Sequence, residues 1–340
     1  MSAFYYLGSL LRGRRGVGSL RFFLPGLVIG LSPVALADSS RQSLEQYFPA
    51  SPLIAQGSEV GEPSSRPMAS VVQSVRLNSS AAMVVDQVSG QVLIEKNADA
   101  ELPIASITKL MTALVVLDAQ LSLDEKVIIT RSDARLEKNP PSRLPVGARL
   151  TRGELLHLAL MSSENRAAQA LGRSYPGGLS GFVRAMNVKA VKLGMASSRF
   201  TEPTGLNAGN VSSPRDLIRL VEEAYLHPEI RRYSTAKQLS IKVRGRTLQF
   251  RNSNALVRAD RWDLGLSKTG FIRDAGRCLV MQAEVESRPV IIVILDAQGK
   301  RHRVRDAETI RKVLIQKAVA PAVEDRSKTG AEQSLARNPV

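Results

Sequence analysis

Short apolar runs and an intervening turn predict a β-hairpin near residue 80. Residues 81–86 form a buried-strand pattern, and residues 92–94 form a second one. Val88-Ser89-Gly90 lies between them and supplies turn-forming residues. The hairpin therefore opens the part of the chain in which hydrophobic periodicity is strong.

Helical periodicity dominates from Ser106 to about Tyr233. Thr151 and Glu154 have the spacing of a capping box, and Ser213 followed by Pro214 is a typical helix start. The predicted helices cover 108–121, 151–161, 165–174, 180–193 and 214–226.

Strand patterns return after this helical block. Residues 238–243 and 247–250 flank Arg244-Gly245-Arg246 and predict a second hairpin. Three further strands are expected at 265–269, 278–285 and 290–295, and an amphipathic helix at 303–318. The order of elements predicts an α+β fold whose sheet is built from both ends of the chain, with the helices inserted between.

The sequence outside this region divides into three segments. Residues 1–37 combine four arginines with an apolar run over 22–36 and the small-x-small site Ala35-Leu36-Ala37, which predicts a cleaved signal peptide and export to a periplasm. A retained membrane anchor is the alternative. Residues 38–75 have the composition of a flexible segment, and 319–340 that of a disordered tail. The catalytic domain is accordingly expected at 76–318.

Charge adds one constraint. The chain has 340 residues, 44% of them hydrophobic, and a net charge of +16. Segment 1–37 carries +4, segment 38–75 carries −2 and segment 319–340 carries 0, which leaves +14 for the intervening 76–318. A basic folded surface suits an anionic partner. No RNA-binding aromatic box, zinc finger or Lys/Arg-rich block is present, so we do not expect nucleic acid to be that partner.

The single cysteine and the three histidines predict no further chemistry. Cys278 cannot form an intrachain disulfide, and its apolar surroundings predict a buried strand residue. His157, His227 and His302 lack metal-ligand spacing and any pattern with Cys278. The sequence therefore predicts neither a metal site nor a cofactor.

Ser106-Ile107-Thr108-Lys109 is the first of three short motifs that predict acyl transfer. On a helix, Ser106 and Lys109 lie on the same face. A serine hydroxyl needs an adjacent base, and a desolvated lysine can act as one when no histidine is available. Ser106 is the predicted nucleophile and Lys109 the predicted base. A solvated lysine on an ordinary helix is the alternative for this motif alone.

Ser163-Glu164-Asn165 follows 57 residues after Ser106, in a break between two predicted helices. Ser163 could relay a proton towards the leaving amine, and Asn165 could hold Lys109 and a substrate carbonyl. Ser163 could also cap the following helix. Glu164 is expected to point away from the site.

Lys268-Thr269-Gly270 lies 103 residues after Asn165, at the end of a strand-like run. Lys268 and Thr269 would bind a substrate carboxylate, and Gly270 would leave room for a ligand beside the strand. The backbone N–H groups of Ser106 and Phe271 are candidates for an oxyanion hole. A second S-K-T-G at 327–330 falls in the polar tail and is interpreted as a chance recurrence.

Together the three motifs resemble those of the low-molecular-mass penicillin-binding proteins, a group of serine D-Ala-D-Ala peptidases. Residues 103–113, 155–168, 202–207 and 265–281 most resemble the D-alanyl-D-alanine endopeptidase branch, the penicillin-binding protein 7 type. The resemblance covers about 78–317 and implies a transpeptidase-like fold with an antiparallel sheet and an inserted helical subdomain.

The resemblance also implies an activity and partners. A penicillin-sensitive endopeptidase of this type would cleave D-Ala to meso-diaminopimelate cross-links in peptidoglycan through an acyl-enzyme on Ser106. Ser163 and Asn165 would assist proton transfer and substrate binding, and Lys268 with Thr269 would recognise the substrate. Peptidoglycan, covalently bound β-lactams and other cell-wall enzymes are the expected partners.

Three alternatives to an endopeptidase can be compared with the sequence. A class A β-lactamase would carry an E-x-x-L-N loop, but Glu202 to Asn207 is one residue too long for it. A D-alanyl-D-alanine carboxypeptidase has the same three motifs and stays an open alternative. Its better-known forms carry an extra C-terminal β-domain and an amphipathic membrane helix; the 22 residues after 318 show neither, which favours the endopeptidase. A non-catalytic binding module would be expected to lack Ser106 or Lys109, and both are present.

Overall fold

The computed structural model describes residues 75–136, 141–259 and 261–319, with the side chains of 317–319 excepted. The predicted signal peptide at 1–37, nearly all of segment 38–75 and the second S-K-T-G at 327–330 lie outside the described residues. In the parts of the chain that are described, no helix is both long and apolar enough to span a membrane.

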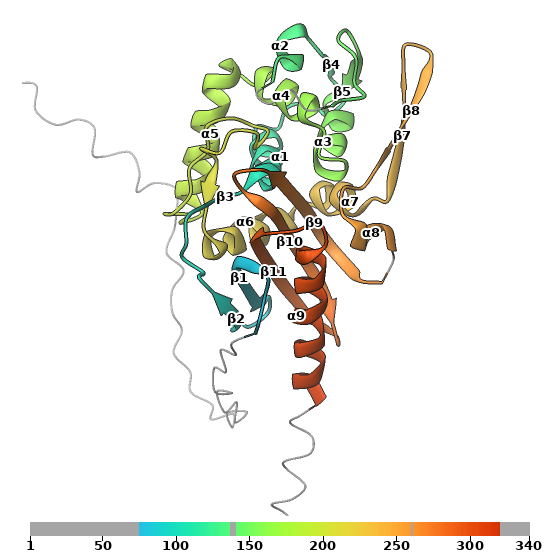
Figure 1. The fold of residues 1–340 in the computed structure, drawn as a ribbon. Coiled ribbons are helices and arrows are strands. Elements are labelled where there is room, and N and C mark those ends of the chain that lie inside the picture. The colour runs from blue at the N-terminus through green and yellow to red at the C-terminus, as the bar shows by residue number, and fades with distance from the viewer. Residues whose placement is uncertain (1–74, 137–140, 260, 320–340) are drawn as a thin grey trace, which may run out of the picture. The chain divides into compact units, whose positions relative to one another are not determined.

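A five-stranded antiparallel sheet is the centre of the fold (Figure 1). Its order is β2-β1-β11-β10-β9, so strands from the start of the described chain lie beside strands from its end. This confirms the predicted α+β fold with a sheet from both ends of the chain. The five strands are β1 (Ser79–Asp86), β2 (Val92–Lys96), β9 (Asp263–Ile272), β10 (Gly276–Val285) and β11 (Arg288–Ala297).

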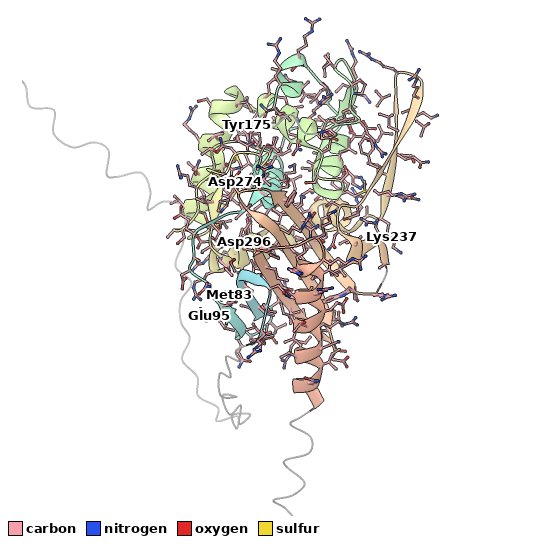
Figure 2. The ribbon with its side chains drawn as sticks, viewed as in Figure 1. Met83, Glu95, Tyr175, Lys237, Asp274 and Asp296 are labelled. Carbon is pink, nitrogen blue, oxygen red and sulfur yellow. The ribbon has the colours of Figure 1, made fainter. Side chains whose placement is uncertain are left out.

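Both faces of the sheet are buried, which explains why its central strands read as continuous apolar runs. Alternate residues of β1 belong to different cores: Met83 joins the cluster on one face, and Val84 joins the cluster on the other. Val84 pairs with Ile292 across β1 and β11, which fixes the register between the two ends of the chain. Figure 2 labels Met83 and Glu95, which are partners across β1 and β2.

One face of the sheet is covered by α9 (His302–Val319), the helix in front of the sheet in Figure 1. Buried Ala307, Ile310 and Leu314 recur at helical spacing and join the core on that side. Asp306 also ties α9 to the start of β1, because its carboxylate accepts hydrogen bonds from the N–H groups of Asn78 (2.9 Å) and Ser79 (2.8 Å).

The other face is covered by α6 (Pro214–Leu226), which contacts β1, β10 and β11. Ser213 caps this helix through the N–H of Asp216, as the sequence predicts. Arg215 extends from the first turn of α6 and bonds to Glu95 on β2 at 2.7 Å and to Asp99 at 2.6 Å.

The helical block surrounds α1 (Thr108–Asp118), every residue of which from Thr108 to Val116 is buried. Thr151 and Glu154 form the predicted capping box at the start of α3. The other helices of the block are α3 (Arg152–Met161), α4 (Asn165–Arg173), α5 (Gly178–Lys192) and α7 (Pro228–Thr235).

The predicted second hairpin is confirmed as β7 (Gln238–Val243) and β8 (Arg246–Arg251), and the structure shows that it pairs separately from the main sheet. Several short elements give too little periodicity to be predicted. They are η1 (Ala105–Ile107), β3 (Leu102–Pro103) paired with β6 (Val211–Ser212), β4 (Lys126–Ile128) paired with β5 (Arg149–Thr151), α2 (Arg131–Ala134) and α8 (Ala255–Ala259).

One predicted boundary is wrong in a way that matters for the site. The strand expected to end near Thr269 continues to Ile272, so Lys268-Thr269-Gly270 lies inside β9. Cys278 of β10 is the register partner of Gly270, and this pairing keeps the strand extended past the motif. The three motif residues therefore have the fixed backbone of a sheet strand and not that of a loop.

We expect Asp306→Ala to lower the free energy of unfolding by about 1–3 kcal/mol, because it leaves the buried N–H of Ser79 without an acceptor. Urea denaturation would measure the change. Asp124→Ala, at an exposed carboxylate, is the matched control and should leave the midpoint nearly unchanged. Equal midpoints for the two variants would contradict the assigned role of Asp306.

Candidate active site

Ser106 lies in η1, directly before the first turn of α1. Ala105 precedes it with φ +48, a left-handed conformation that is uncommon for a residue with a side chain. Ala105 and Ile107 are buried, whereas Ser106 is partly exposed. The backbone therefore turns sharply so that the hydroxyl of Ser106 reaches the surface between two buried neighbours.

Lys109, one turn later, is completely buried, and its Nζ contacts three acceptors. It lies 2.8 Å from Ser106 Oγ, 2.8 Å from Asn165 Oδ1 and 2.6 Å from the carbonyl oxygen of Thr204. All three acceptors are uncharged, so the amine is held by hydrogen bonds without a direct ion pair.

Burial lowers the pKa of Lys109 to about 7, because desolvation disfavours the ammonium form. The carboxylates of Glu202 and Glu164 act in the opposite direction and offset part of this effect. A lysine with a pKa near neutrality is a usable base, whereas an exposed lysine is almost fully protonated at pH 7.

Ser163 lies in the predicted break between α3 and α4, and Asn165 lies at its end. Ser163 has φ +60, and this left-handed turn separates the two helices. The alternative that Ser163 caps the next helix is wrong, because Glu164 is the capping residue and accepts from the N–H of Arg166. Asn165 is the first residue of α4 and directs its amide oxygen to Lys109, as predicted.

Glu164 is buried and its carboxylate accepts a 2.6 Å hydrogen bond from Ser142, in addition to capping α4. It does not bond to any of the motif side chains of Ser106, Lys109 or Lys268 in the described structure. Its negative charge still acts on Lys109, because it raises the pKa of that amine. The expectation that it points away therefore misses an electrostatic role.

The third motif meets the second through Lys268. Its Nζ donates to Ser163 Oγ at 2.9 Å and to the carbonyl oxygen of Thr269 at 2.9 Å. The neighbouring hydroxyl of Thr269 donates to Ser253 Oγ at 2.7 Å. Burial is the main reason that the pKa of Lys268 lies well below its usual range, and the nearby charges of Lys109 and Arg303 add to the effect.

Gly270 has a structural role that differs from the expected one. A Cβ at this position would lie 2.8 Å from the carbonyl oxygen of Ile104 and 3.2 Å from the nitrogen of Ser106. The absent side chain thus lets β9 approach the backbone that leads into Ser106. Phe271, the next residue, has 55% of its side chain exposed and packs under the guanidinium of Arg277.

The family model described as D-alanyl-D-alanine carboxypeptidase, peptidase S11, matches residues 68–299. The chain belongs to this peptidase family. The match includes all three motifs and the strands and helices that carry them. It confirms the resemblance to serine D-Ala-D-Ala peptidases on which the sequence analysis depends.

Curated relatives include both activities named in the sequence analysis. A D-alanyl-D-alanine endopeptidase of Pseudomonas aeruginosa is 46% identical over 250 residues, which cover 73% of this chain and 81% of the relative. One of Escherichia coli is 46% identical over 235 residues, with 68% and 76% coverage. The Escherichia coli carboxypeptidase DacC is 30% identical over 250 residues, with 70% and 62% coverage.

Solved structures give the same fold. The Streptomyces K15 DD-transpeptidase superposes with a TM-score of 0.66 at 28% identity, covering 71% of this chain and 98% of that one. Penicillin-binding protein D2 from Listeria monocytogenes, determined in a cefotaxime-bound form, gives a TM-score of 0.62 at 31% identity with the same coverage. The predicted transpeptidase-like fold is therefore confirmed.

The loop at 202–207, which resembles that of the endopeptidase branch and is one residue too long for a class A deacylation loop, supports the candidate active site. The carboxylate of Glu202 accepts from the N–H groups of Thr204 and Gly205, each at 2.6 Å. Asn210 ties the loop to α1 through Thr108 Oγ1 at 3.1 Å. These bonds fix the Thr204 carbonyl that contacts Lys109. The polar and turn-forming residues at 202–207 are the signal for this loop in the sequence. The contact of the Thr204 carbonyl with Lys109 cannot be predicted from sequence, because every residue has a backbone carbonyl.

The side chains of Cys278 and His157 lie in surroundings that do not favour catalysis. Cys278 is buried in β10 as predicted, and burial raises the pKa of its thiol to about 12. Among the described residues, no group of three or more His, Cys, Asp or Glu side chains could hold a metal ion. His157 stacks on Tyr233, and burial lowers its pKa to about 4.

Gly205 provides a test of the loop. It has φ +77, and a Cβ there would lie 1.9 Å from the carbonyl oxygen of Ala105, beside the backbone of Ser106. We expect Gly205→Ala to lower the free energy of unfolding by about 2 kcal/mol or more and to slow acylation by penicillin strongly. The added Cβ would force apart the backbone of the loop and that of Ala105 and Ser106, which would displace the nucleophile.

Gly90→Ala is the matched control for this prediction. Gly90 also has a positive φ, +70, but a Cβ there would meet no atom within 4 Å. Gly90→Ala should lower the free energy of unfolding only by the strain of a left-handed alanine, about 1 kcal/mol, and should leave the acylation rate unchanged. Thermal unfolding and the rate of labelled-penicillin binding measure the two effects. Similar acylation rates in both variants would contradict the role given to the loop.

Proposed function

We propose that this chain is an exported serine D,D-endopeptidase that hydrolyses D-Ala to meso-diaminopimelate cross-links in peptidoglycan through an acyl-enzyme on Ser106. The observation that carries the proposal is the buried Lys109 amine, with its pKa near 7, 2.8 Å from Ser106 Oγ. The 46% identity to two curated endopeptidases supports the choice of bond.

Proton transfer follows from the three acceptors of Lys109. An ammonium group has three N–H bonds, one for each acceptor. When it loses one proton, the N–H bonds to Asn165 and to the Thr204 carbonyl can remain, which leaves the lone pair directed at Ser106. The Ser106 hydroxyl then donates its proton to Nζ as Oγ attacks the scissile carbonyl, and the C–O bond of a tetrahedral intermediate forms.

Collapse of this intermediate breaks the amide C–N bond, and the leaving amine needs a proton. The proton that Lys109 took from Ser106 is passed to this amine, which returns Lys109 to its neutral form, and the Ser163 hydroxyl, which contacts Lys268 in the described structure, is the proposed relay. The N–H groups of Ser106 and Phe271 are the proposed oxyanion donors. Water then attacks the acyl-enzyme carbonyl, with Lys109 as base, and releases Ser106.

Substrate recognition is assigned to the strand motif. Lys268 is buried, and among the described residues no carboxylate forms an ion pair with it. A substrate carboxylate near Lys268 and Thr269 would supply a counter-charge and favour the ammonium form. A β-lactam presents an equivalent acid beside its reactive carbonyl, so covalent capture by penicillin is expected. A periplasmic location and work beside other cell-wall enzymes are parts of the same proposal.

A D-alanyl-D-alanine carboxypeptidase is the second candidate. Its support is the 30% identity to the DacC carboxypeptidase and the shared family. The chemistry on Ser106 is the same in both cases. The two candidates differ only in whether the bond attacked joins two stem peptides or releases a terminal D-Ala.

Two assays on the purified chain test this proposal. Wild-type protein should take up labelled penicillin covalently, and Ser106→Ala should take up none. With purified muropeptides, cross-linked dimers should be converted to monomers. A label that survives in Ser106→Ala would contradict acylation at this residue. Release of free D-Ala from pentapeptides without loss of dimers would replace the endopeptidase with the carboxypeptidase.

The acylation rate should depend on pH through Lys109. Its amine must be neutral to accept the proton, so the rate constant should rise with pH and level off above about 7. Asn165→Asp places a carboxylate at the 2.8 Å contact and should move this rise upward by about one pH unit or more. Asn97→Asp, on an exposed turn, is the matched control. Identical profiles for the wild type and Asn165→Asp would contradict Lys109 as the base.

A further inference from the structure

A groove of about 750 Å³ lies between α8 and the first turns of α9. Its lining includes six cations, which we call the basic groove: Arg258, Lys300, Arg301, Arg303, Arg305 and Lys312. Arg301, Arg305 and Lys312 are spaced by four and seven residues, which places them on one side of α9 and its entry turn. The sole acidic residue in the lining, Glu308, accepts a hydrogen bond from the Trp262 ring nitrogen at 2.9 Å.

The basic groove has an excess of charge that the described fold does not neutralise. Within the described ranges, none of its six cations forms an ion pair, although arginines and lysines elsewhere in the same ranges do so. All except Arg303 are exposed. Like charges placed together destabilise a fold by mutual repulsion, so a cluster of this kind in a concave surface indicates binding of an anion.

The basic groove shares two residues with the surroundings of the candidate active site. Ser253 lines the groove and accepts the hydrogen bond from Thr269. Arg303 also lines it, and donates to the carbonyl oxygen of Gly270 at 3.0 Å. A ligand in the groove is therefore next to the strand that is proposed to hold the substrate carboxylate.

We propose that the basic groove is a second binding site for peptidoglycan, which holds carboxylate-bearing stem peptides next to the one being cleaved. This inference rests on the proposed function, since it assigns the same polymer to both sites. Stem peptides carry free carboxylates, and a polymer delivers many of them close to one another. Several weak ion pairs made by one strand then add up to useful affinity.

The shape of the site and its position favour the wall polymer over a membrane surface. A lipid surface is flat and is usually bound by cations together with exposed apolar side chains. The five exposed cations here line a concave groove, and none of the large exposed hydrophobic side chains of the described chain lines it; Phe271 of β9 packs under the guanidinium of Arg277. Because Ser253 and Arg303 of the groove contact β9, a ligand in the groove lies next to the candidate active site, as a strand of the wall polymer would.

Binding to insoluble sacculi tests this proposal. The protein should carry Ser106→Ala, so that the polymer is not digested, and binding should be measured by co-sedimentation. Removing three charges by Arg301→Gln, Arg305→Gln and Lys312→Gln should weaken binding about tenfold, since each exposed pair contributes a fraction of a kcal/mol up to about one. Binding of the unmodified groove should also fall steeply between about 50 and about 300 mM NaCl.

A second triple variant controls for the loss of net charge. Lys126→Gln, Arg131→Gln and Arg149→Gln remove three exposed cations from β4, α2 and β5, far along the chain from the groove. This variant should bind sacculi like the parent protein. Equal weakening in the two triple variants would mean that overall charge is responsible, and the groove proposal would be overturned.

Two further measurements separate the outcomes. With Ser106 intact, both triple variants should react with soluble labelled penicillin at the wild-type rate, because that ligand is too small to reach the groove. Loss of penicillin labelling in the wild type would contradict the proposed function but not the groove, which is tested without Ser106. Binding to anionic phospholipid vesicles in place of sacculi, abolished by the groove substitutions, would overturn the wall polymer as the ligand.

Discussion

The site depends on keeping one lysine amine dry and in contact with a serine hydroxyl. Lys109 is completely buried, and desolvation is the largest cause of its lowered pKa. Burying an amine is costly unless its hydrogen bonds are satisfied. Here Asn165 and the Thr204 carbonyl provide that satisfaction without a full counter-charge, so the amine stays basic enough to accept a proton and is not locked as an ammonium.

Each of these partners comes from a different part of the chain, which makes the contact a product of the whole fold. Lys109 lies on α1 at the centre of the helical block, Asn165 begins α4, and Thr204 belongs to a loop held by Glu202 and Asn210. The sheet joins the two ends of the sequence and brings β9 against η1, where Gly270 permits close approach. Local unfolding of any one element would therefore admit water to Lys109.

The sequence predicts the framework well, because periodicity and motif spacing are properties of side chains. The hairpins, the long helices, the sheet from both ends and the serine-lysine pair can all be predicted in this way. The Thr204 carbonyl cannot, since a backbone group is the same in every residue. Glu164 as a helix cap and Lys268 in mid-strand were also missed, because helix and strand limits depend on tertiary pairing that local patterns do not encode.

The distribution of positive charge connects catalysis and binding in this chain. Lys109 and Arg303 lie close enough to Lys268 for their positive charges to lower its pKa, in addition to the larger effect of burial. Such a cluster opposes folding, yet it makes a negatively charged substrate the natural counter-ion. Arg303 extends this field from the strand motif to the exposed cations on α9. Part of the basic surplus of the folded region therefore lies where the proposed site would hold an anionic polymer, and binding of such a polymer would offset the repulsion among these charges.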